Sequence, residues 1–366
     1  MKILLFGEFS GLMNCLKDGL EALGQEVFIA SDGNGYKNYP SNFRWDAGIG
    51  WKLGKLHSIF FAINIWLHKK LFKGYDVVYL IDPNLISRIR WINEPIYNFI
   101  IKNNKLVYQC GCGDTCFCVD YWYDSKTKYH EYYEGYKIEG NFKNYKNHRL
   151  KKWEKDLLNK INGYIPIWYE YAEPYRNLDC SKKAIRIPID LNQFNYRPNI
   201  VKEKIVFYHG VNRECKGTRF IRKAFELMEQ KYKDKAEFIC ASRLPFNEYM
   251  RVMEKVNVIV DDANSYSIAM NGLFSLQKGR IVMGGAEHLG NKELGIPDEE
   301  NPVFNINPDV EQICSVITYI ISNKDKIEEW GLAGRKYVEK YYDSVAIARE
   351  YMDLWTNDLK NKKIGK

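Results

Sequence analysis

The feature that most constrains the fold is a strand–helix alternation that runs through the chain twice. Its first round has predicted strands at Lys2–Phe6, Val27–Ala30, Val77–Ile81, Leu106–Cys110, Tyr164–Ile167 and Ala184–Ile187. Helices lie between them, and Leu12–Leu23 is the clearest because its leucines recur at helical spacing and Gly24 ends it. Parallel strands need such crossover helices, so this half predicts a mostly parallel sheet covered on both faces.

The polar stretch Tyr196–Lys204 interrupts this rhythm and has the composition of an interdomain linker. The second round has predicted strands at Ile205–His209, Glu237–Ala241, Val256–Asp261, Arg280–Met283 and Val303–Ile306. Its predicted helices are Thr218–Tyr232, Asn247–Lys255, Ala269–Gln277, Val310–Ser322, Lys324–Tyr341 and Ser344–Leu359. The sequence therefore predicts an α/β protein with two doubly wound domains, residues 1–198 and 199–342.

The net charge and the N-terminal sequence indicate which partners and which cellular location to expect. The 366 residues carry a net charge of +8, which suits anionic small molecules or an anionic membrane surface. No nucleic-acid-binding motif accompanies the charge, so we expect no nucleic-acid partner. The apolar run after Met1 is too short for a signal segment and no later run could span a bilayer, so we expect a cytoplasmic protein.

Nine cysteines, an odd number, are typical of reduced thiols in a chain of this kind. Four of them cluster between Cys110 and Cys118 as two C-x-C pairs, whereas zinc sites usually use C-x2-C spacing. The cluster is either a metal or redox site or a set of small buried residues where a strand enters a loop. We predict no metal there.

Two segments combine lysines with aromatic residues. Residues 51–73 carry five lysines and no acid, and residues 126–155 carry nine Lys and Arg against four Glu. Such segments either lie on an anionic membrane or pack on the sheet with a solvated lysine edge, and the need for covering helices favours packing.

A basic turn follows the strand Ile205–His209 and precedes the helix Thr218–Tyr232. Gly210 and Gly217 bound it, and Arg213 and Lys216 add two cations near a helix start, where the helix dipole opposes them. An anion such as a phosphate would relieve that conflict and be held by backbone N–H groups. The alternative is a solvated turn. His209, which ends the strand, is either a ligand contact or a buried neutral histidine.

Four segments together resemble GT-B retaining glycosyltransferases of the group 1 type. These are Ile187–Phe194, the turn with Arg213 and Lys216-Gly217, Leu273–Val282, and Gly284-Gly285-Ala286-Glu287. The resemblance implies the GT-B fold: two Rossmann-like domains facing a central cleft, with a last helix, residues 343–366, that returns to the N-terminal domain.

The resemblance also implies a transfer of sugar from a nucleotide-diphosphate sugar to a saccharide or lipid-linked acceptor, in a bacterial polysaccharide or glycolipid pathway. It implies retention of anomeric configuration and no cofactor besides the donor substrate. The expected donor-binding residues are Gly210, Arg213, Lys216, Gly217, Asp261, Asp262, Gly284, Gly285 and Glu287. Cations on the leaving diphosphate can replace a metal ion, so we expect a metal-independent enzyme.

One departure from the family pattern bears on the donor site. Phe274 stands where the family has the glutamate that contacts the ribose. Either Asp261 or Asp262 at the preceding strand end takes over that contact, or the donor site is altered or lost. The two acids could instead cap a helix or line a surface loop. The same departure favours a non-catalytic nucleotide-sugar-binding or scaffold protein as an alternative, and a GT-B epimerase-like enzyme is another.

Two carboxylates are candidates on the acceptor side. Glu8 follows the first strand and either contacts the acceptor or caps the next helix. Asp114 follows the strand Leu106–Cys110 and either orients or deprotonates an acceptor hydroxyl, or forms an Asx-turn. Peripheral contact with the inner membrane face would fit a lipid-linked acceptor.

Overall fold

The structure, a computed structural model, describes residues 1–33, 38–48, 50–124, 129–130, 132–134, 145–211, 213–242 and 246–364. These residues divide into two compact units. Unit 1 comprises Met1–Asp120, Tyr145–Asp190 and Tyr342–Lys366, and unit 2 comprises Tyr121–Asn144 and Leu191–Tyr341. The chain therefore leaves unit 1 twice and returns to it twice.

Unit 1 is built on a parallel sheet of six strands in the order β3-β2-β1-β4-β5-β6. The strands are β1 (Lys2–Phe6), β2 (Glu26–Ser31), β3 (Phe43–Arg44), β4 (Val77–Leu80), β5 (Leu106–Gly111) and β6 (Gly163–Pro166). β1, β4, β5 and β6 are almost wholly buried, as a sheet covered on both faces requires.

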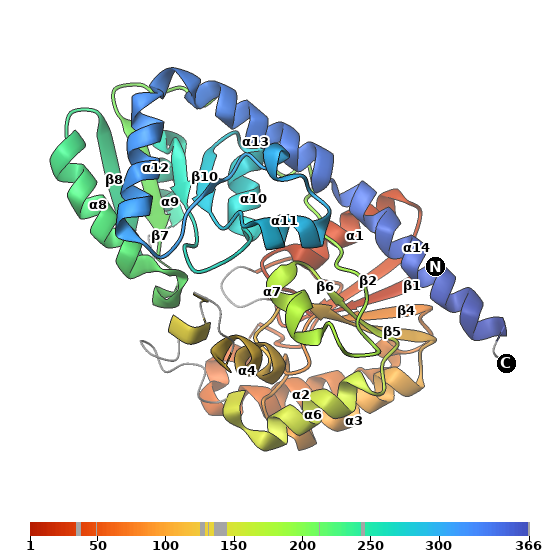
Figure 1. Cartoon of the computed structure of the whole chain (residues 1–366). Helices are drawn as coiled ribbons and strands as arrows, with labels where there is room; N and C mark the ends of the chain where they lie inside the picture. Colours follow the sequence, from red (N-terminus) through yellow and green to blue (C-terminus); the bar gives the residue numbers. More distant parts are fainter. Residues whose placement is uncertain are drawn as a thin grey trace. The chain divides into compact units, whose positions relative to one another are not determined.

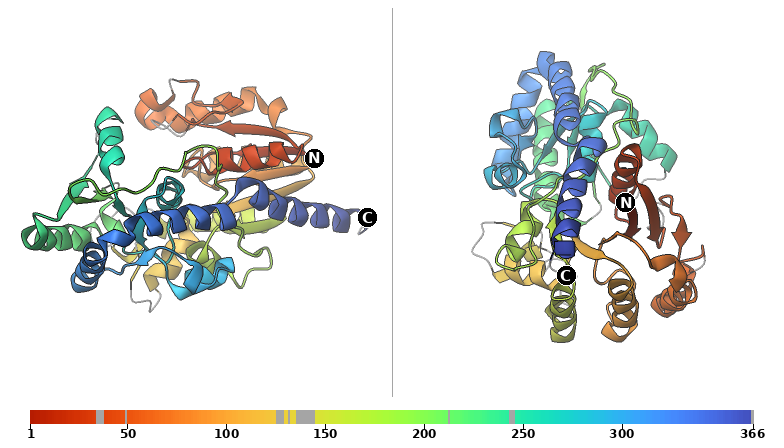
Figure 2. Two further views of the ribbon diagram at one scale, coloured as in Figure 1. Left: turned by 90° about the horizontal axis from the view of Figure 1, so that it is seen from above. Right: turned by 90° about the vertical axis from the view of Figure 1, so that its right-hand side faces the viewer.

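Helices cover both faces of this sheet (Figure 1). The helices of unit 1 are α1 (Leu12–Ala22), α2 (His57–Leu67), α3 (Arg90–Lys102), α6 (His148–Leu158), α7 (Tyr169–Ala172), α14 (Ser344–Ile364) and the first part of α4 (Cys116–Asp124), whose residues from Tyr121 on group with unit 2. α1 and α14 lie side by side (Figure 2). Tyr79 of β4 donates a 3.0 Å hydrogen bond to, or accepts one from, Tyr351 of α14, while Phe6 of β1 packs edge-on against Tyr97 of α3. These aromatic contacts therefore pack α14 against one face of the sheet and α3 against the other.

Unit 2 has a five-stranded parallel sheet in the order β11-β10-β9-β7-β8. The strands are β7 (Ile205–Gly210), β8 (Ala236–Ala241), β9 (Val258–Val260), β10 (Ile281–Gly284) and β11 (Phe304–Asn305). The helices are α8 (Thr218–Tyr232), α9 (Phe246–Lys255), α10 (Met270–Gln277), α11 (His288–Leu294), α12 (Val310–Ser322) and α13 (Ile327–Tyr341).

The core of unit 2 follows from strand alternation. Phe207, Val258 and Met283 point to one face, where they join buried residues of α8 and α12. Their neighbours in each strand point to the other face, where α10 and α13 pack together and against β10. β7, β9 and β10 are buried on both faces, so their β-branched and aromatic residues are needed on both, whereas the edge strands β8 and β11 are only partly buried.

The sequence-based elements are largely confirmed, with one error. The predicted strand Ala184–Ile187 is not a strand: Ile185 N–H donates to Pro166 O at 2.9 Å, but these residues form no ladder with β6. The apolar residues there serve burial rather than strand pairing, since Ala184, Ile185 and Ile187 are all buried.

The segment 51–73 differs from a simple packed helix. α2 buries Phe61 and Ile65 but exposes large apolar side chains on its other side. The basic segment 126–155 lies partly outside the described residues. Within the part of the chain that the structure describes, no helix is both long and apolar enough to cross a bilayer.

Candidate active site

The strand order places one candidate site in each unit. In unit 1 the order reverses between β1 and β4, which are adjacent and both central. In unit 2 it reverses between β7 and β9. Open α/β sheets bind ligands outside the carboxyl ends of the strands at such a reversal, because the loops there diverge and leave a crevice. The loops after β1, β4, β7 and β9 are therefore the places to look.

Glu8 follows β1 and is fully buried. Its Oε1 accepts the N–H of Gly11 at 2.8 Å, and its Oε2 accepts the backbone N–H and side-chain amide of Asn14 at 2.9 and 2.6 Å. Burial raises the pKa of Glu8, against the lowering effect of these hydrogen bonds. The carboxylate thus caps the start of α1, and a direct contact with an acceptor stays a prediction.

Asp82 follows β4 at the same reversal and was not among the residues expected from the sequence. Its side chain is buried, its Oδ1 accepts the N–H of Asn84 at 2.5 Å, and its Oδ2 lies 2.5 Å from the place a Cβ at Gly113 would take. Burial raises the pKa of the Asp82 carboxyl to about 7. A carboxyl poised near neutral pH at a strand end can donate or accept a proton.

Asp114, in the loop after β5, is half-buried and adds a like charge that raises the pKa of Asp82 further. A third acid, Glu154 of α6, lies close by: it accepts from Asn84 Nδ2 at 2.7 Å and from Cys116 N–H at 2.8 Å, and burial raises its pKa to about 8. Unit 1 therefore brings Asp82, Asp114 and Glu154 to one edge. The sequence signal for Asp82 was its place directly after a buried strand; Glu154 sits mid-helix and gave none.

Arg88 and Tyr145 complete this edge of unit 1. The Arg88 guanidinium donates to Tyr145 Oη at 3.1 Å and lies 4.8 Å from the centre of its ring. Arg88 also lowers the pKa of Asp82, in opposition to burial. Among the described residues, the edge thus combines the Arg88 guanidinium with the carboxyls of Asp82, Asp114 and Glu154, a set that can orient hydroxyl groups.

In unit 2, the basic turn occupies the space between β7 and α8. Arg213 is extended and half-buried, and a single 3-10 turn, Glu214–Lys216, leads into the helix. Gly217 stands at the α8 N-cap with φ of 77°, a conformation that favours glycine. Lys216 Nζ lies 3.4 Å from Asp262 Oδ2, so one cation of the turn is held beside the end of β9.

Asp261 and Asp262 have different surroundings. Asp262 is engaged: besides Lys216, its Oδ1 accepts the N–H of Asn264 at 2.8 Å. Asp261 is buried, and its Oδ2 has no hydrogen-bond donor among the described residues. That oxygen lies 3.2 Å from the place a Cβ at Gly272 of α10 would take, so it faces the helix that follows β9. A buried acceptor without a donor is costly, and a ligand hydroxyl would satisfy it.

The glycine loop after β10 packs closely on the segment before α10. A Cβ at Gly285 would lie 2.3 Å from Ser265 O, and one at Gly284 would lie 3.1 Å from Ile268 Cγ2. Position 285 therefore requires glycine, because any side chain there would clash with the backbone of Ser265. Glu287 Oε1 accepts from Asn305 Nδ2 at 2.9 Å and from Tyr129 Oη at 2.7 Å.

Tyr129 belongs to the stretch Tyr121–Asn144, which lies in the first half of the sequence but groups with unit 2. Its ring stacks on Tyr266 with centroids 5.4 Å apart, and the ring of Trp122, in α4, has its centroid 5.7 Å from that of Tyr266. No sequence pattern linked Tyr129 to Glu287, because the two residues are 158 positions apart in the chain.

The structure also shows the surroundings of Phe274 and His209, which the sequence analysis singled out. The ring of Phe274 packs edge-on against Phe194, with centroids 5.2 Å apart. Both ring nitrogens of His209 are engaged, Nδ1 with Val260 O at 2.8 Å and Nε2 with Thr218 Oγ1 at 3.0 Å, and burial lowers its pKa. His209 therefore links β7, β9 and α8 as a neutral side chain. In the described part of the chain, no group of three or more metal-ligating side chains comes together.

Comparisons with known proteins place this geometry in a fold family. No family model matches the sequence, and no curated protein matches it. Among solved structures, sucrose-phosphate synthase from Thermosynechococcus elongatus matches with a TM-score of 0.64 at 16% identity, over 99% of this chain and 100% of that one. Anabaena HepE in complex with UDP and glucose matches with a TM-score of 0.61 at 12% identity, over 98% and 100%. The chain has the GT-B fold.

A third match shows the range of this fold. UDP-GlcNAc 2-epimerase from Neisseria meningitidis, bound to UDP-GlcNAc, aligns over 98% of this chain and 100% of its own at 11% identity and a TM-score of 0.52. The predicted GT-B fold is confirmed, while the chemistry carried on a GT-B fold has to be argued from the site.

Proposed function

We propose that this GT-B protein transfers a sugar from a nucleotide-diphosphate sugar, bound by unit 2, to a saccharide or lipid-linked acceptor that unit 1 binds. The proposal rests on two features found together at the carboxyl edge of the sheet in unit 2. One is the basic turn, where Lys216 lies beside Asp262, and the other is the buried carboxylate of Asp261, whose Oδ2 has no hydrogen-bond donor among the described residues.

The chemistry of a nucleotide sugar matches both the basic turn and Asp261. The diphosphate needs cations and N–H donors, which Arg213, Lys216 and the α8 start can supply. Ribose or sugar hydroxyls need acceptors, and Asp261 has one to offer. Phe274, lacking any acceptor, leaves that role to Asp261. The solved structures with UDP and glucose, or with UDP-GlcNAc, show that ligands of this class bind GT-B proteins.

On the acceptor side, the proposal gives Asp82 and Asp114 the task of orienting or deprotonating an acceptor hydroxyl. The near-neutral pKa of Asp82 suits proton transfer. Glu8 supports the loop by capping α1. Transfer with retention and without a metal ion is part of the same proposal, because two cations at the diphosphate can stabilise the leaving group and the sequence has no Asp-x-Asp motif.

The deciding experiment combines binding and turnover. UDP-, GDP-, ADP- and CMP-sugars are screened by thermal shift, and a radiolabelled form of the best donor is then tested for transfer. Ligand at 100 times its Kd should add about 2.7 kcal/mol to the free energy of unfolding. Asp261→Asn should weaken donor binding or turnover, whereas the exposed Asp234→Asn should not. If no nucleotide binds at millimolar concentration, the proposal is wrong and the scaffold alternative gains.

An epimerase-like activity is the second candidate, since the Neisseria epimerase shares this fold over its whole length. Incubation with donor alone separates the two: an epimerase changes the sugar without an acceptor, whereas a transferase needs one. Nuclear magnetic resonance of the transferred anomeric centre then reports whether configuration is retained.

A membrane surface is the proposed location of a lipid-linked acceptor. α2 and its flanks expose the apolar side chains of Leu56, Ile59, Ile63, Trp66 and Leu67. Exposed Lys69, Lys70 and Lys73 follow directly, and Lys69 Nζ lies 4.6 Å from the centre of the Trp66 indole. An apolar face bordered by lysines suits the boundary of an anionic bilayer.

Vesicle sedimentation tests this location. Wild-type protein should bind vesicles with anionic lipid more than neutral ones, and binding should fall with salt. Trp66→Ser with Leu67→Ser should reduce it, while substitution of the exposed Leu289 to Ser in unit 2 should not. Equal sedimentation with neutral and anionic vesicles would refute membrane contact.

A further inference from the structure

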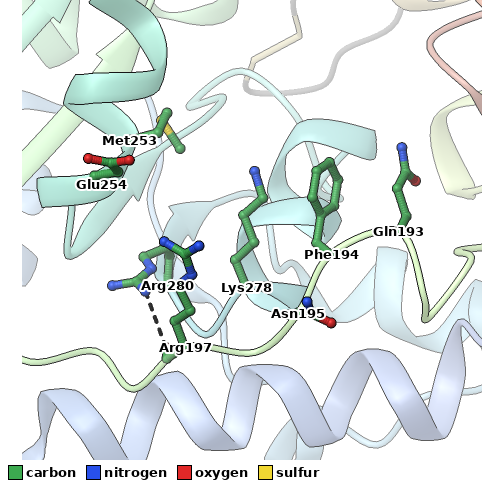
Figure 3. Close-up of a pocket in the computed structure, with 8 residues that line it drawn as sticks. All are labelled: Gln193, Phe194, Asn195, Arg197, Met253, Glu254, Lys278 and Arg280. Carbon is green, nitrogen blue, oxygen red and sulfur yellow. Dashed lines mark hydrogen bonds between the residues drawn. The ribbon is translucent and has the colours of Figure 1, made fainter.

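A second basic site lies in unit 2, away from the turn that carries Lys216. It is a cavity of about 290 Å³ lined mainly by Phe194, Arg197, Met253, Glu254, Lys278 and Arg280 (Figure 3). We call it the basic pocket.

The basic pocket is at the opposite edge of the sheet from the candidate donor site. Arg280 directly precedes β10, Lys278 is the C-cap of α10, and Glu254 is near the end of α9, before β9. In a parallel sheet, strand starts and the ends of the preceding helices share the amino edge. Lys216 and Asp261 are at the carboxyl edge, where helices begin. The two sites are therefore separated by the length of the strands.

The charge in the basic pocket is not balanced. Three cations line it against one carboxylate, Glu254, and no carboxylate among the described residues forms an ion pair with any of them. Among the described residues, Arg280 donates to three neutral oxygens and to no carboxylate: Asn199 Oδ1 at 3.1 Å, Val256 O at 3.3 Å and Arg197 O at 3.2 Å. Carbonyl contacts thus explain why Arg280 can be buried, but they leave its charge uncompensated.

Carbonyl contacts of this kind do not account for the positions of the Lys278 and Arg197 charges. Lys278 Nζ lies 3.9 Å from the centre of the Phe194 ring, and Figure 3 shows the lysine chain beside that ring with the Arg197 guanidinium on its other side. Burial lowers the pKa of Lys278, and repulsion from Arg280 and Arg197 lowers it further. Like charges gathered without a counter-charge are unfavourable unless an anion binds among them.

We propose that the basic pocket binds a small phosphorylated molecule, with Arg197 and Lys278 contacting the phosphate and Phe194 and Met253 contacting the remainder. Arginine presents a planar fork to phosphate oxygens and lysine a point charge, so the pair suits a multiply charged phosphate better than a single carboxylate. The volume admits a ligand of the size of pyrophosphate or a hexose phosphate, near the lower limit of small-molecule sites. The site is additional to the proposed donor site and does not depend on it.

Titration calorimetry with inorganic pyrophosphate at constant ionic strength tests the proposal. Lys278→Gln and Arg197→Gln should each weaken one binding event at least about tenfold, the loss expected for one charge-assisted contact. Glu254→Gln should strengthen the same event. Lys255→Gln is the matched control, because it removes one exposed lysine from α9 without altering the pocket lining.

A second variant separates this pocket from the donor site. In Lys216→Gln, the event that depends on Lys278 should persist, whatever becomes of binding at the basic turn. Repeating the titration with a hexose phosphate distinguishes an organic phosphate, which should bind more tightly through Phe194 and Met253, from simple phosphate recognition. The proposal is overturned if pyrophosphate does not bind, if Lys255→Gln weakens binding as much as Lys278→Gln, or if all binding disappears in Lys216→Gln.

Discussion

Replacing Asp82 by asparagine should make the protein more stable, and increasingly so as the pH rises. The folded-state pKa of Asp82 is about 7, against about 3.9 for an unfolded aspartate. The folded protein therefore holds this proton more tightly than the unfolded chain does. The stability that results is fully present below about pH 4 and is lost as the pH rises through 7. Asparagine resembles the protonated acid in shape and cannot lose a proton, so the variant escapes that loss.

The magnitude follows from the shift. Between pH 5 and the folded-state pKa of about 7, each pH unit costs the wild type about 1.36 kcal/mol. The advantage of Asp82→Asn should therefore grow by about 2.7 kcal/mol between pH 5 and pH 9. Removing the Asp82 charge also removes one of the smaller causes that raise the pKa of Glu154, which changes stability in the same direction.

Urea denaturation of both proteins at pH 5, 7 and 9 measures this difference. Asp76→Asn is the control: burial would raise the pKa of Asp76, but hydrogen bonds from Lys105 and from Lys2 N–H outweigh it and lower that pKa. Its contribution is then complete above about pH 4, so the effect of Asp76→Asn should not change between pH 5 and pH 9. If the difference between Asp82→Asn and wild type is the same at pH 5 and pH 9, Asp82 does not titrate near neutrality and its proposed role in proton transfer loses its support.

Three further predictions concern unit 2. Lys216→Ala should lower the free energy of unfolding by about 1–3 kcal/mol, because Asp262 is buried and would lose its cation; it should also weaken binding of a nucleoside diphosphate, and unchanged affinity in calorimetry would exclude the turn as the diphosphate site. Gly285→Ala should destabilise by about 1–3 kcal/mol in urea denaturation, because its Cβ would lie 2.3 Å from Ser265 O; an unchanged midpoint would show that the loop moves freely. Glycosyl transfer should survive EDTA, and turnover that is lost in EDTA and restored by Mg²⁺ or Mn²⁺ would refute a metal-independent mechanism.

What the sequence determined by itself was the set of local elements. β1, α8 and α12 begin and end at the predicted residues, since helix and strand periods, turn residues and caps act over a few neighbours. The basic turn was also visible, because a strand, its cations and the next helix are contiguous. The GT-B fold followed from the repeated alternation together with motifs that each lie within one short segment.

The tertiary structure decided which of these elements meet. Strand order put Asp82 beside the loop of Glu8, and α6 brought Glu154 to the same edge. Burial then raised the pKa of both Asp82 and Glu154. Tyr129 reached Glu287, and three cations gathered in the basic pocket, through contacts between residues far apart in the chain. Burial of charged groups, acceptors without a donor and repulsion between like charges depend on neighbours in space. A pattern along the sequence does not show which residues those neighbours are.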